Sequence, residues 1–194
     1  QNDGNDGDKF VEMFDHRNRV VESTQNGDIP NVGVLMIACN RTSLLENSLR
    51  QLVDIRAHTR RRFQERFQMS PLLPIVVSLD CGHSSTHEAT VNIAKKANGS
   101  IVEIFRYPFA GEPVPNLDEK QRKLEGYYRI ARHYRFAIEL TFRRNPSLDQ
   151  LIIVEDDLNF SPDFFEYFLS LSPLLQNDSS VMCVSAWNDN GKSE

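Results

Sequence analysis

The stretch LIIVEDDLNFSPDFFEYF, residues 151–168, sets a buried strand, a row of acids and a helix start side by side. Four apolar residues at 151–154 predict a short strand covered by protein. Glu155, Asp156 and Asp157 follow without a break. Three adjacent carboxylates repel one another and resist desolvation, so water, a basic neighbour or a metal ion must compensate their charge.

The rest of the chain repeats this alternation of strands and helices. Residues 32–38 are a continuous apolar run, typical of a strand covered on both faces, and mostly apolar segments predict further strands at 74–80, 101–105 and 181–187. Helical spacing predicts helices at 43–53, 85–97 and 118–142, and a fourth that begins near residue 161. Because strands and helices alternate, we expect an α/β layer fold with a largely parallel sheet and flanking helices.

Residues with known preferences mark the expected helix ends. Ser43 and Glu46 match a capping box, and Ser161 is expected to cap a helix that has Pro162 at its first position. The other end signals are Ser84 or Ser85 as a cap, Gly99 just past the second helix, and Asn145-Pro146 as the stop of the third.

Length, charge and hydropathy bound the class of protein. The chain has 194 residues, which suits one domain, and 22 basic against 27 acidic side chains give a net charge of −5. We therefore expect no nucleic-acid partner, and no apolar run predicts a membrane span. Residues 1–28 are polar and predict a mobile tail, or a short helix docked outside the core, before a domain at 29–194. The polar start without an initiator Met suggests a piece of a longer chain.

Three polar clusters follow predicted strands at their carboxyl ends, namely Cys39-Asn40-Arg41, Asp80-Cys81-Gly82-His83 and the acids at 155–157. Because open α/β sheets bind ligands at this edge, we expect one site there. Carboxylates at a strand end suit Mg²⁺ or Mn²⁺, which also take phosphate oxygens and water. Spacing alone supports equally well that the acids are solvated loop residues that cap the next helix. No glycine-rich phosphate loop is present, so a metal and Arg41 would have to hold a diphosphate.

Two further polar segments could be functional, but each has a simpler structural interpretation. Residues 58–70 are basic and could form an anion site, but a solvated charged turn or helix end is the favoured interpretation. Cys81, His83 and His87 come nearest to a zinc-ligand spacing, but this spacing does not match the known closed sites, and we expect no zinc there.

Five stretches carry a resemblance to a known family: VLMIACNR, PIVVSLDCGH, KLEGYYRIARHYRFA, IIVEDDLNFSPDFFEYF and CVSAWNDNGK, which together cover most of 34–191. The chain resembles the N-acetylglucosaminyltransferase I family, whose enzymes start complex N-glycan synthesis in the Golgi. A related enzyme that adds GlcNAc to protein O-mannose shares the acidic motif, the DFF and the SAWND. It is less similar around Cys81-Gly-His83 and Arg132-His133-Tyr134.

The resemblance implies a GT-A type fold with UDP-GlcNAc as donor and Mn²⁺ as cofactor. The family forms an inverted β1,2 linkage on the terminal α1,3-linked mannose of a high-mannose N-glycan. The parent protein would act on the lumenal side of the Golgi membrane, held by an anchor outside this chain. Two alternatives are kept: transfer of GlcNAc to protein O-mannose, and a non-catalytic module that binds a nucleotide sugar.

The resemblance also assigns roles to single residues, and it reads the acidic triplet as the family's variant of the DxD motif. Asp157 would be the direct metal ligand, Asp156 would bind the ribose, and Glu155 would lie beside the sugar nucleotide. A bound metal would neutralise charge on the departing diphosphate, which would compensate the three acids.

Three more residues are assigned to the nucleotide. Asp80 and His133 would contact the uracil, and Arg41 would lie at the nucleotide near the phosphates. Plain alternatives exist, because a lone helix histidine is usually structural and Asp80 could simply cap the turn before Gly82. The Tyr127–Tyr128 pair and Trp187 are expected in the core or the wall of the site.

Cysteines and the catalytic base complete what the resemblance implies. Cys39 and Cys81 would form a disulfide beside the nucleotide, and Cys183 would pair with a cysteine downstream of residue 194. An oxidising lumen fits this disulfide. The family's general base is also expected downstream of Glu194, so no catalytic residue is assigned here. We therefore expect the donor half of a site, without turnover.

Asparagine residues supply the remaining expectations. Asn98 and Asn177 begin glycosylation sequons in expected surface turns, whereas the sequon at Asn40 would lie in the site. Asn40 also stands where we expect aspartate in vertebrate members of the family, which could alter contacts to the nucleotide.

Overall fold

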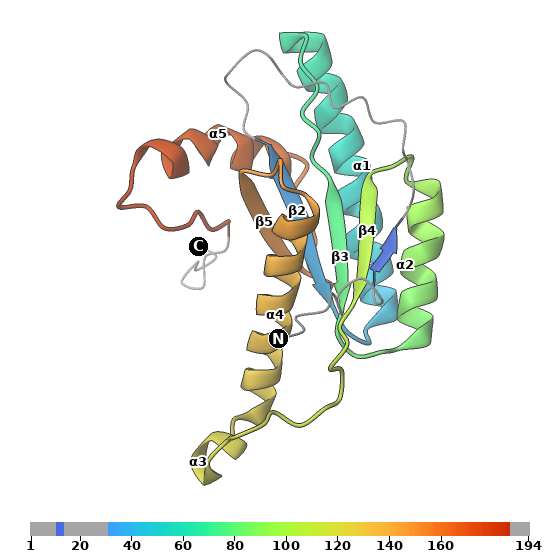
Figure 1. Ribbon diagram of the computed structural model, residues 1–194. Helices are drawn as coiled ribbons and strands as arrows, with labels where there is room; N and C mark the ends of the chain where they lie inside the picture. The colour runs from blue at the N-terminus through green and yellow to red at the C-terminus, as the bar shows by residue number, and fades with distance from the viewer. Residues whose placement is uncertain (1–10, 14–30, 187–194) are drawn as a thin grey trace, which may run out of the picture.

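A computed structural model describes residues 11–13 and 31–186, which form a sheet with helices on both faces (Figure 1). The strands lie in the order β1 (Val11–Met13), β4 (Ile101–Arg106), β3 (Ile75–Leu79), β2 (Val32–Ala38) and β5 (Gln150–Glu155). β1 is antiparallel to β4, and the other four strands are parallel. The predicted α/β class with a mostly parallel sheet is confirmed, and it is consistent with a GT-A-like domain.

The helices divide between the two faces of the sheet (Figure 1). One face is covered by α1 (Thr42–Phe67), α2 (Ser84–Lys96) and α5 (Phe164–Asn177), and the other by α4 (Glu125–Arg144). Side chains alternate along a strand, so Val34 and Met36 of β2 join the core under the first layer, whereas Leu35 and Ile37 join the core under α4. Every residue of β2 and β3 is buried, which is why both strands are apolar apart from Ser78.

The strand order reverses at β2. From β2 the chain moves to β3 and β4 on one side, with α1 and α2 as crossovers, and after α4 it returns to β5 on the other side of β2. Ligands of open α/β sheets bind beyond the carboxyl ends of the strands at such a switch point. Ile37 pairs with Glu155 and Ala38 with Leu79, so the residues that follow β5, β2 and β3 meet at one edge.

Two strand predictions need correction. Residues 11–13, expected in a mobile tail or a docked helix, form β1, because β4 offers them a free edge on which to pair. The expected strand at 181–187 is wrong: residues 181–186 have no regular structure, and Met182 is 91% exposed. An apolar run becomes a strand only where another strand accepts its backbone hydrogen bonds, and none of the described strands lies alongside it. Residues 1–10, 14–28 and 187 lie outside the described part of the chain.

The expected helix at 118–142 is two helices. α3 (Glu119–Arg122) begins with a capping box between Asp118 and Gln121, and α4 begins only after Leu124. The predicted C-terminal end of this helix is confirmed, because Asn145 is the C-terminal cap of α4. α4 extends beyond the sheet toward α3, and its first two turns are accordingly the most exposed (Figure 1).

Three predicted helix starts also differ. No capping box forms at Ser43 and Glu46, because α1 begins with Arg41 as its N-cap. α2 begins at Ser84 with His83 as its N-cap, one residue before the expected start. α5 begins at Phe164 instead of Pro162, since Ser161 directs its hydroxyl to the carboxylate of Asp163. None of the described helices is both long and apolar enough to cross a membrane.

Candidate functional site

Arg41 lies at the end of the short loop between β2 and α1 and reaches the two aspartates that follow β5. Its Nη2 lies 2.6 Å from Asp156 Oδ1, and its Nη1 lies 2.5 Å from Asp157 Oδ2. One guanidinium therefore spans two carboxylates across the switch point. Burial alone would lower the pKa of Arg41, but the charges and hydrogen bonds of the two aspartates outweigh burial and raise it. In this structure a basic neighbour compensates two of the three adjacent acids.

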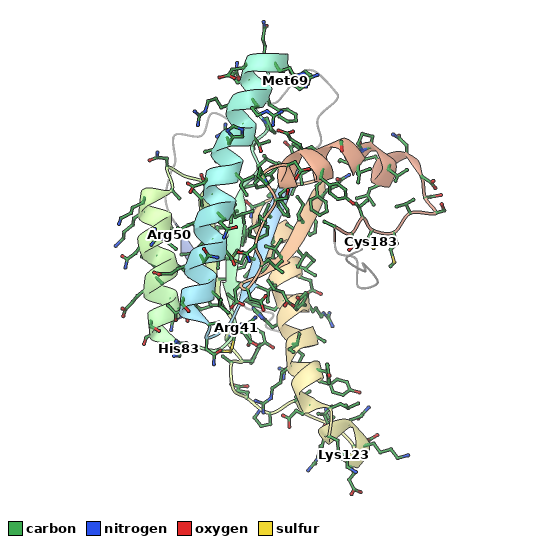
Figure 2. The ribbon with its side chains drawn as sticks, turned by 180° about the vertical axis from the view of Figure 1, so that it is seen from behind. Arg41, Arg50, Met69, His83, Lys123 and Cys183 are labelled. Carbon is green, nitrogen blue, oxygen red and sulfur yellow. A yellow bond between two sulfur atoms is a disulfide. The ribbon has the colours of Figure 1, made fainter. Side chains whose placement is uncertain are left out.

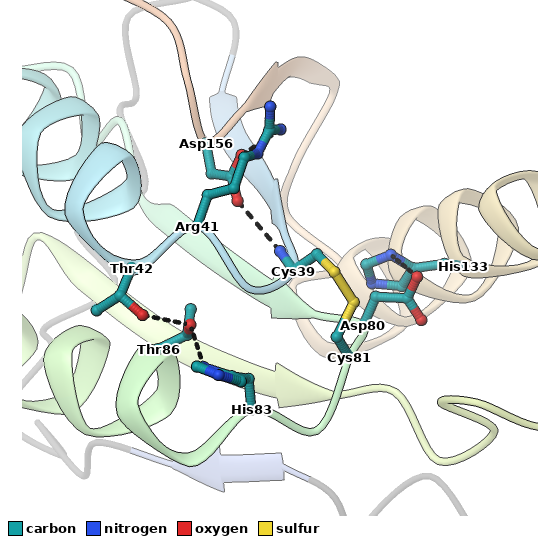
Figure 3. The surroundings of a disulfide bond; sticks show 9 residues. All are labelled: Cys39, Arg41, Thr42, Asp80, Cys81, His83, Thr86, His133 and Asp156. Carbon is teal, nitrogen blue, oxygen red and sulfur yellow. Dashed lines mark hydrogen bonds and ion pairs between the residues drawn. A yellow bond between two sulfur atoms is a disulfide. The ribbon is translucent and has the colours of Figure 1, made fainter.

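The two aspartates differ in their exposure to solvent. The Asp156 side chain is 1% exposed, and its Oδ2 accepts a hydrogen bond from the Cys39 backbone N–H at 3.1 Å (Figure 3). Both of its carboxylate oxygens are thus held by the protein. The Asp157 side chain is 33% exposed, and only its Oδ2 bonds to Arg41. Asp156 is therefore a fixed anchor, whereas Asp157 can meet a ligand from solvent.

Glu155 turns to the opposite face of the sheet. It is the last residue of β5, and along this strand Ile152 and Val154 face the α1 layer, so residue 155 faces α4. There the Tyr134 hydroxyl donates a hydrogen bond of 2.8 Å to Glu155 Oε1. The fold therefore separates three consecutive acids, with two bound to Arg41 on one side and one bound to a tyrosine on the other.

His133 and Asp80 meet at the end of β3 (Figure 3). His133 is buried, and its Nε2 lies 2.8 Å from the Ser78 hydroxyl. Burial lowers the pKa of His133 to about 4, so the ring is neutral at pH 7. Its Nδ1 lies 3.9 Å from Asp80 Oδ2, and with a neutral ring this contact is not an ion pair. Burial also raises the pKa of Asp80, which nearby Arg129 partly offsets.

A disulfide joins Cys39 and Cys81, the pair that the resemblance implies, with their Cα atoms 4.9 Å apart. It ties the loop after β2, which carries Arg41, to the loop after β3, which carries Asp80 (Figure 3). Because Cys39 also donates its N–H to Asp156, the disulfide, the acids and Arg41 form one connected unit.

Hydroxyl groups join the starts of α1 and α2 beside this unit. Thr42 lies 2.8 Å from the Thr86 hydroxyl and 3.1 Å from that of Ser85, and His83 Nδ1 lies 2.9 Å from Ser85. Arg41 and His83 accordingly mark the same end of the molecule in Figure 2. The Thr42 hydroxyl contacts join α1 to α2, whereas the contact between His83 and Ser85 lies within the start of α2.

The acids at the end of β5 fit a metal ion only if a bound ligand supplies further oxygen atoms. The described residues contain no group of three or more His, Cys, Asp or Glu side chains that could hold a metal. Asp157 offers one partly exposed carboxylate, and Mn²⁺ or Mg²⁺ often binds through one carboxylate plus phosphate oxygens and water. The donor set therefore fits a metal that arrives with a phosphate-bearing ligand. Cys81 is bonded to Cys39 and offers no thiolate to zinc.

Several residues considered in the sequence lie away from this edge. Most of the basic segment at 58–70 forms the far end of α1, which Met69 marks in Figure 2, and Arg62 pairs there with Glu166 at 2.8 Å. Tyr127 was expected in the core or the wall but is 74% exposed, because its turn of α4 extends past the sheet. Cys183 is exposed and makes no disulfide within the described residues.

An open groove of about 1410 Å³ runs beside β5, between α5 and residues 182–186. Its lining is largely apolar and includes Ile152, Phe164 and Met182. Asp157 lies among the lining residues, so the groove borders the acidic end of the site.

Contacts across long sequence separations were not visible in the sequence. The Ser48 hydroxyl donates to the Leu158 carbonyl oxygen at 2.6 Å, and the Phe160 N–H donates to Gln51 at 3.2 Å, so α1 anchors the loop that follows the acids. The bond from Tyr134 to Glu155 was also missed. In the sequence, this hydrogen bond is indicated only by a tyrosine on the helix expected to cover the sheet, near the expected acidic cluster.

Together, the sheet order and the charged cluster at the switch point define an α/β domain of the GT-A-like class. A model of the GNT-I family matches residues 9–194, and the chain belongs to this family. The chain is also similar to an alpha-1,3-mannosyl-glycoprotein 2-beta-N-acetylglucosaminyltransferase of Arabidopsis thaliana, with 26% identity over 185 residues. These residues are 95% of this chain and 37% of that relative, so the chain spans little more than a third of its length.

Proposed function

We propose that this chain is the donor-binding part of an inverting, Mn²⁺-dependent N-acetylglucosaminyltransferase. It would bind UDP-GlcNAc, whose sugar passes in β1,2 linkage to the α1,3-linked mannose of a high-mannose N-glycan. Membership of the GNT-I family and the name of the Arabidopsis relative support this activity. The observation that carries the proposal is Asp157, a partly exposed carboxylate that pairs with Arg41 at the switch point of the sheet.

The proposed roles of the acids follow from their contacts. Asp156 is buried and held by Arg41 and by the Cys39 N–H, so it would accept a hydrogen bond from a ribose hydroxyl at Oδ1, the oxygen that Arg41 releases when it turns to the ligand. Asp157 would hold Mn²⁺, which supplies positive charge that stabilises the departing diphosphate. Once Asp157 shares its charge with a metal, Arg41 is free to bind phosphate oxygens, which suits its forked guanidinium.

The nucleobase would lie at the end of β3. Asp80 is the more exposed member of its pair and would accept a hydrogen bond from the uracil. His133 lies behind it, buried against Ser78, and its neutral ring would fix the position of Asp80 at the base. The disulfide between Cys39 and Cys81 would hold the nucleobase and phosphate sides of the site at a constant separation.

We propose no general base among residues 1–194. Inverting transfer needs a base that deprotonates the attacking hydroxyl, and the resemblance implies one further along the family's chain. A lumenal Golgi location is part of the proposal, and the disulfide supports it because disulfides persist in oxidising compartments.

Electron paramagnetic resonance of Mn²⁺ with UDP tests the role of Asp157. We expect the chain to bind Mn²⁺ when UDP is present, and Asp157→Asn to weaken this binding about tenfold or more. Asp149→Asn is the matched control, because Asp149 directly precedes β5 at the opposite edge and bonds to the Asn31 N–H. Equal loss of Mn²⁺ binding in both variants, or in neither, would contradict the proposed metal site.

A further inference from the structure

The side chain of Tyr134 has a contact that the assignments above do not use. Its hydroxyl donates to Glu155 Oε1 at 2.8 Å, from the middle of α4 to the last residue of β5. The residue before it, His133, is buried against Ser78 at the end of β3. Two consecutive residues of α4 thus reach two different strand ends of the same site, on either side of β2.

The ring of Tyr134 is fixed by packing, so its hydroxyl has a defined position. It is partly buried against the core under α4, which includes Leu35 and Ala137. Burial and the bond to Glu155 raise the pKa of Tyr134, so the hydroxyl stays protonated and remains a donor at working pH. Among the described residues the structure shows no second hydrogen bond to the exposed Glu155 carboxylate.

The charged groups around Glu155 determine which ligand groups its carboxylate can bind. Arg41 is engaged with Asp156 and Asp157 on the other side of the sheet, and within the described residues no arginine or lysine forms an ion pair with Glu155. A carboxylate without a cation is repelled by a diphosphate, but it accepts hydrogen bonds from neutral hydroxyl groups. The part of a nucleotide sugar that offers such groups beyond the diphosphate is the sugar.

We propose that Tyr134 is a positioning residue, which orients Glu155 so that its free oxygen accepts a hydrogen bond from a hydroxyl of the bound sugar. This inference rests on the proposed function, because it requires a nucleotide sugar at the switch point. Tyr134 itself does not touch the ligand. It acts by holding the carboxylate on the α4 side, away from the two aspartates.

Calorimetric titration with UDP and with UDP-GlcNAc, both with Mn²⁺, separates positioning from general stability. We expect Tyr134→Phe, which keeps the ring and loses the hydroxyl, to weaken UDP-GlcNAc binding about five- to tenfold and to leave UDP binding within about twofold. Tyr167→Phe on α5 is the matched control: it also loses one hydrogen bond, which the Tyr167 hydroxyl donates to the Ser185 carbonyl oxygen, and it should change neither affinity.

A double variant shows whether Tyr134 acts through Glu155. We expect Glu155→Ala to weaken UDP-GlcNAc more than UDP, and Tyr134→Phe to add nothing in that background. Equal weakening of both ligands by Tyr134→Phe, no weakening at all, or the same loss in both backgrounds would overturn the inference. If the unaltered chain binds neither ligand, the proposed function itself fails, and the inference fails with it.

Discussion

Arg41 compensates the negative charges of Asp156 and Asp157 at the carboxyl edge of the sheet. Asp156 is almost fully buried, and a buried carboxylate is stable only when a cation or hydrogen bonds compensate its charge. Arg41 and the Cys39 N–H supply both. The same guanidinium covers the exposed Asp157, so one residue neutralises the fixed acid and the acid that can meet a ligand.

Replacing Arg41 tests this balance in the absence of any ligand. We expect Arg41→Met to lower the free energy of unfolding by about 2 kcal/mol, less than for a fully buried pair because Arg41 is partly exposed. Urea denaturation at neutral pH measures the change. Arg50→Met is the control, since Arg50 lies on α1 at 3.9 Å from Glu46 in an exposed pair and should cost under about 0.5 kcal/mol.

His133 makes stability depend on pH. Its folded pKa of about 4 lies below the unfolded value of 6.5, so its contribution is complete above pH 6.5 and is lost as pH falls toward 4. The loss amounts to at most about 3 kcal/mol. Asp80, whose pKa burial raises, contributes with the opposite sign. We expect His133→Gln to flatten the fall in unfolding free energy between about pH 6.5 and pH 4. An unchanged slope would show that His133 is not buried in its neutral form.

At the scale of elements, the site depends on how the ends of β2, β3 and β5 are tied together. The disulfide joins the first two, and Arg41 joins the first and the third. α1 then fixes the loop after the acids through Ser48 and Gln51. Each polar residue is therefore placed by contacts between elements distant in sequence.

Removing the disulfide should loosen this arrangement. Cys39 and Cys81 are 42 residues apart, and loop-closure entropy for that separation gives a stabilisation of about 4 kcal/mol. We expect the double variant Cys39→Ala, Cys81→Ala to lose an amount of this order in chemical denaturation. Cys183→Ala, which removes the exposed free thiol, should leave the transition midpoint where it is. A double variant as stable as the original chain would show that the bond constrains little.

The parallel strands were predictable, but the helix ends and one apolar run were not. β2 and β3 are buried throughout, and strands covered on both faces consist mostly of apolar residues. The run at 181–187 looks the same in sequence, but pairing with a neighbour decides whether it forms a strand. Ser43 resembles a cap, yet Thr42 and Arg41 engage partners outside α1. Asp118 and Gln121 carried a readable capping signal that the helical pattern of 118–142 concealed.

For the whole molecule, the strand order places the site. The chain winds away from β2 in one direction through β3 and β4, and then returns to β5 on the other side. The alternation of strands and helices predicts that polar clusters gather at one edge, and the structure places them there. Their pairing could not be predicted, because it depends on the register of β5 against β2 and on the side of the sheet to which each acid turns.

The groove beside β5 is the other large feature of the molecule. β5 is the edge strand of the described sheet, Ile153 is 41% exposed there, and the groove reaches Asp157. A donor bound at Asp157 would therefore lie at the border of an open apolar surface, and the charged and apolar parts of this side of the molecule meet at that residue.

Calorimetric titration of UDP-GlcNAc into the chain, with and without Mn²⁺, tests whether the switch point of the sheet holds a metal-dependent donor site. We expect binding with Mn²⁺, and affinity at least about tenfold weaker when the metal is left out or when Asp157→Ala replaces the exposed acid. Asp149→Ala should bind as the unaltered chain does. Equal affinity with and without the metal, or no binding under either condition, would contradict a metal-dependent donor site at the switch point of this sheet.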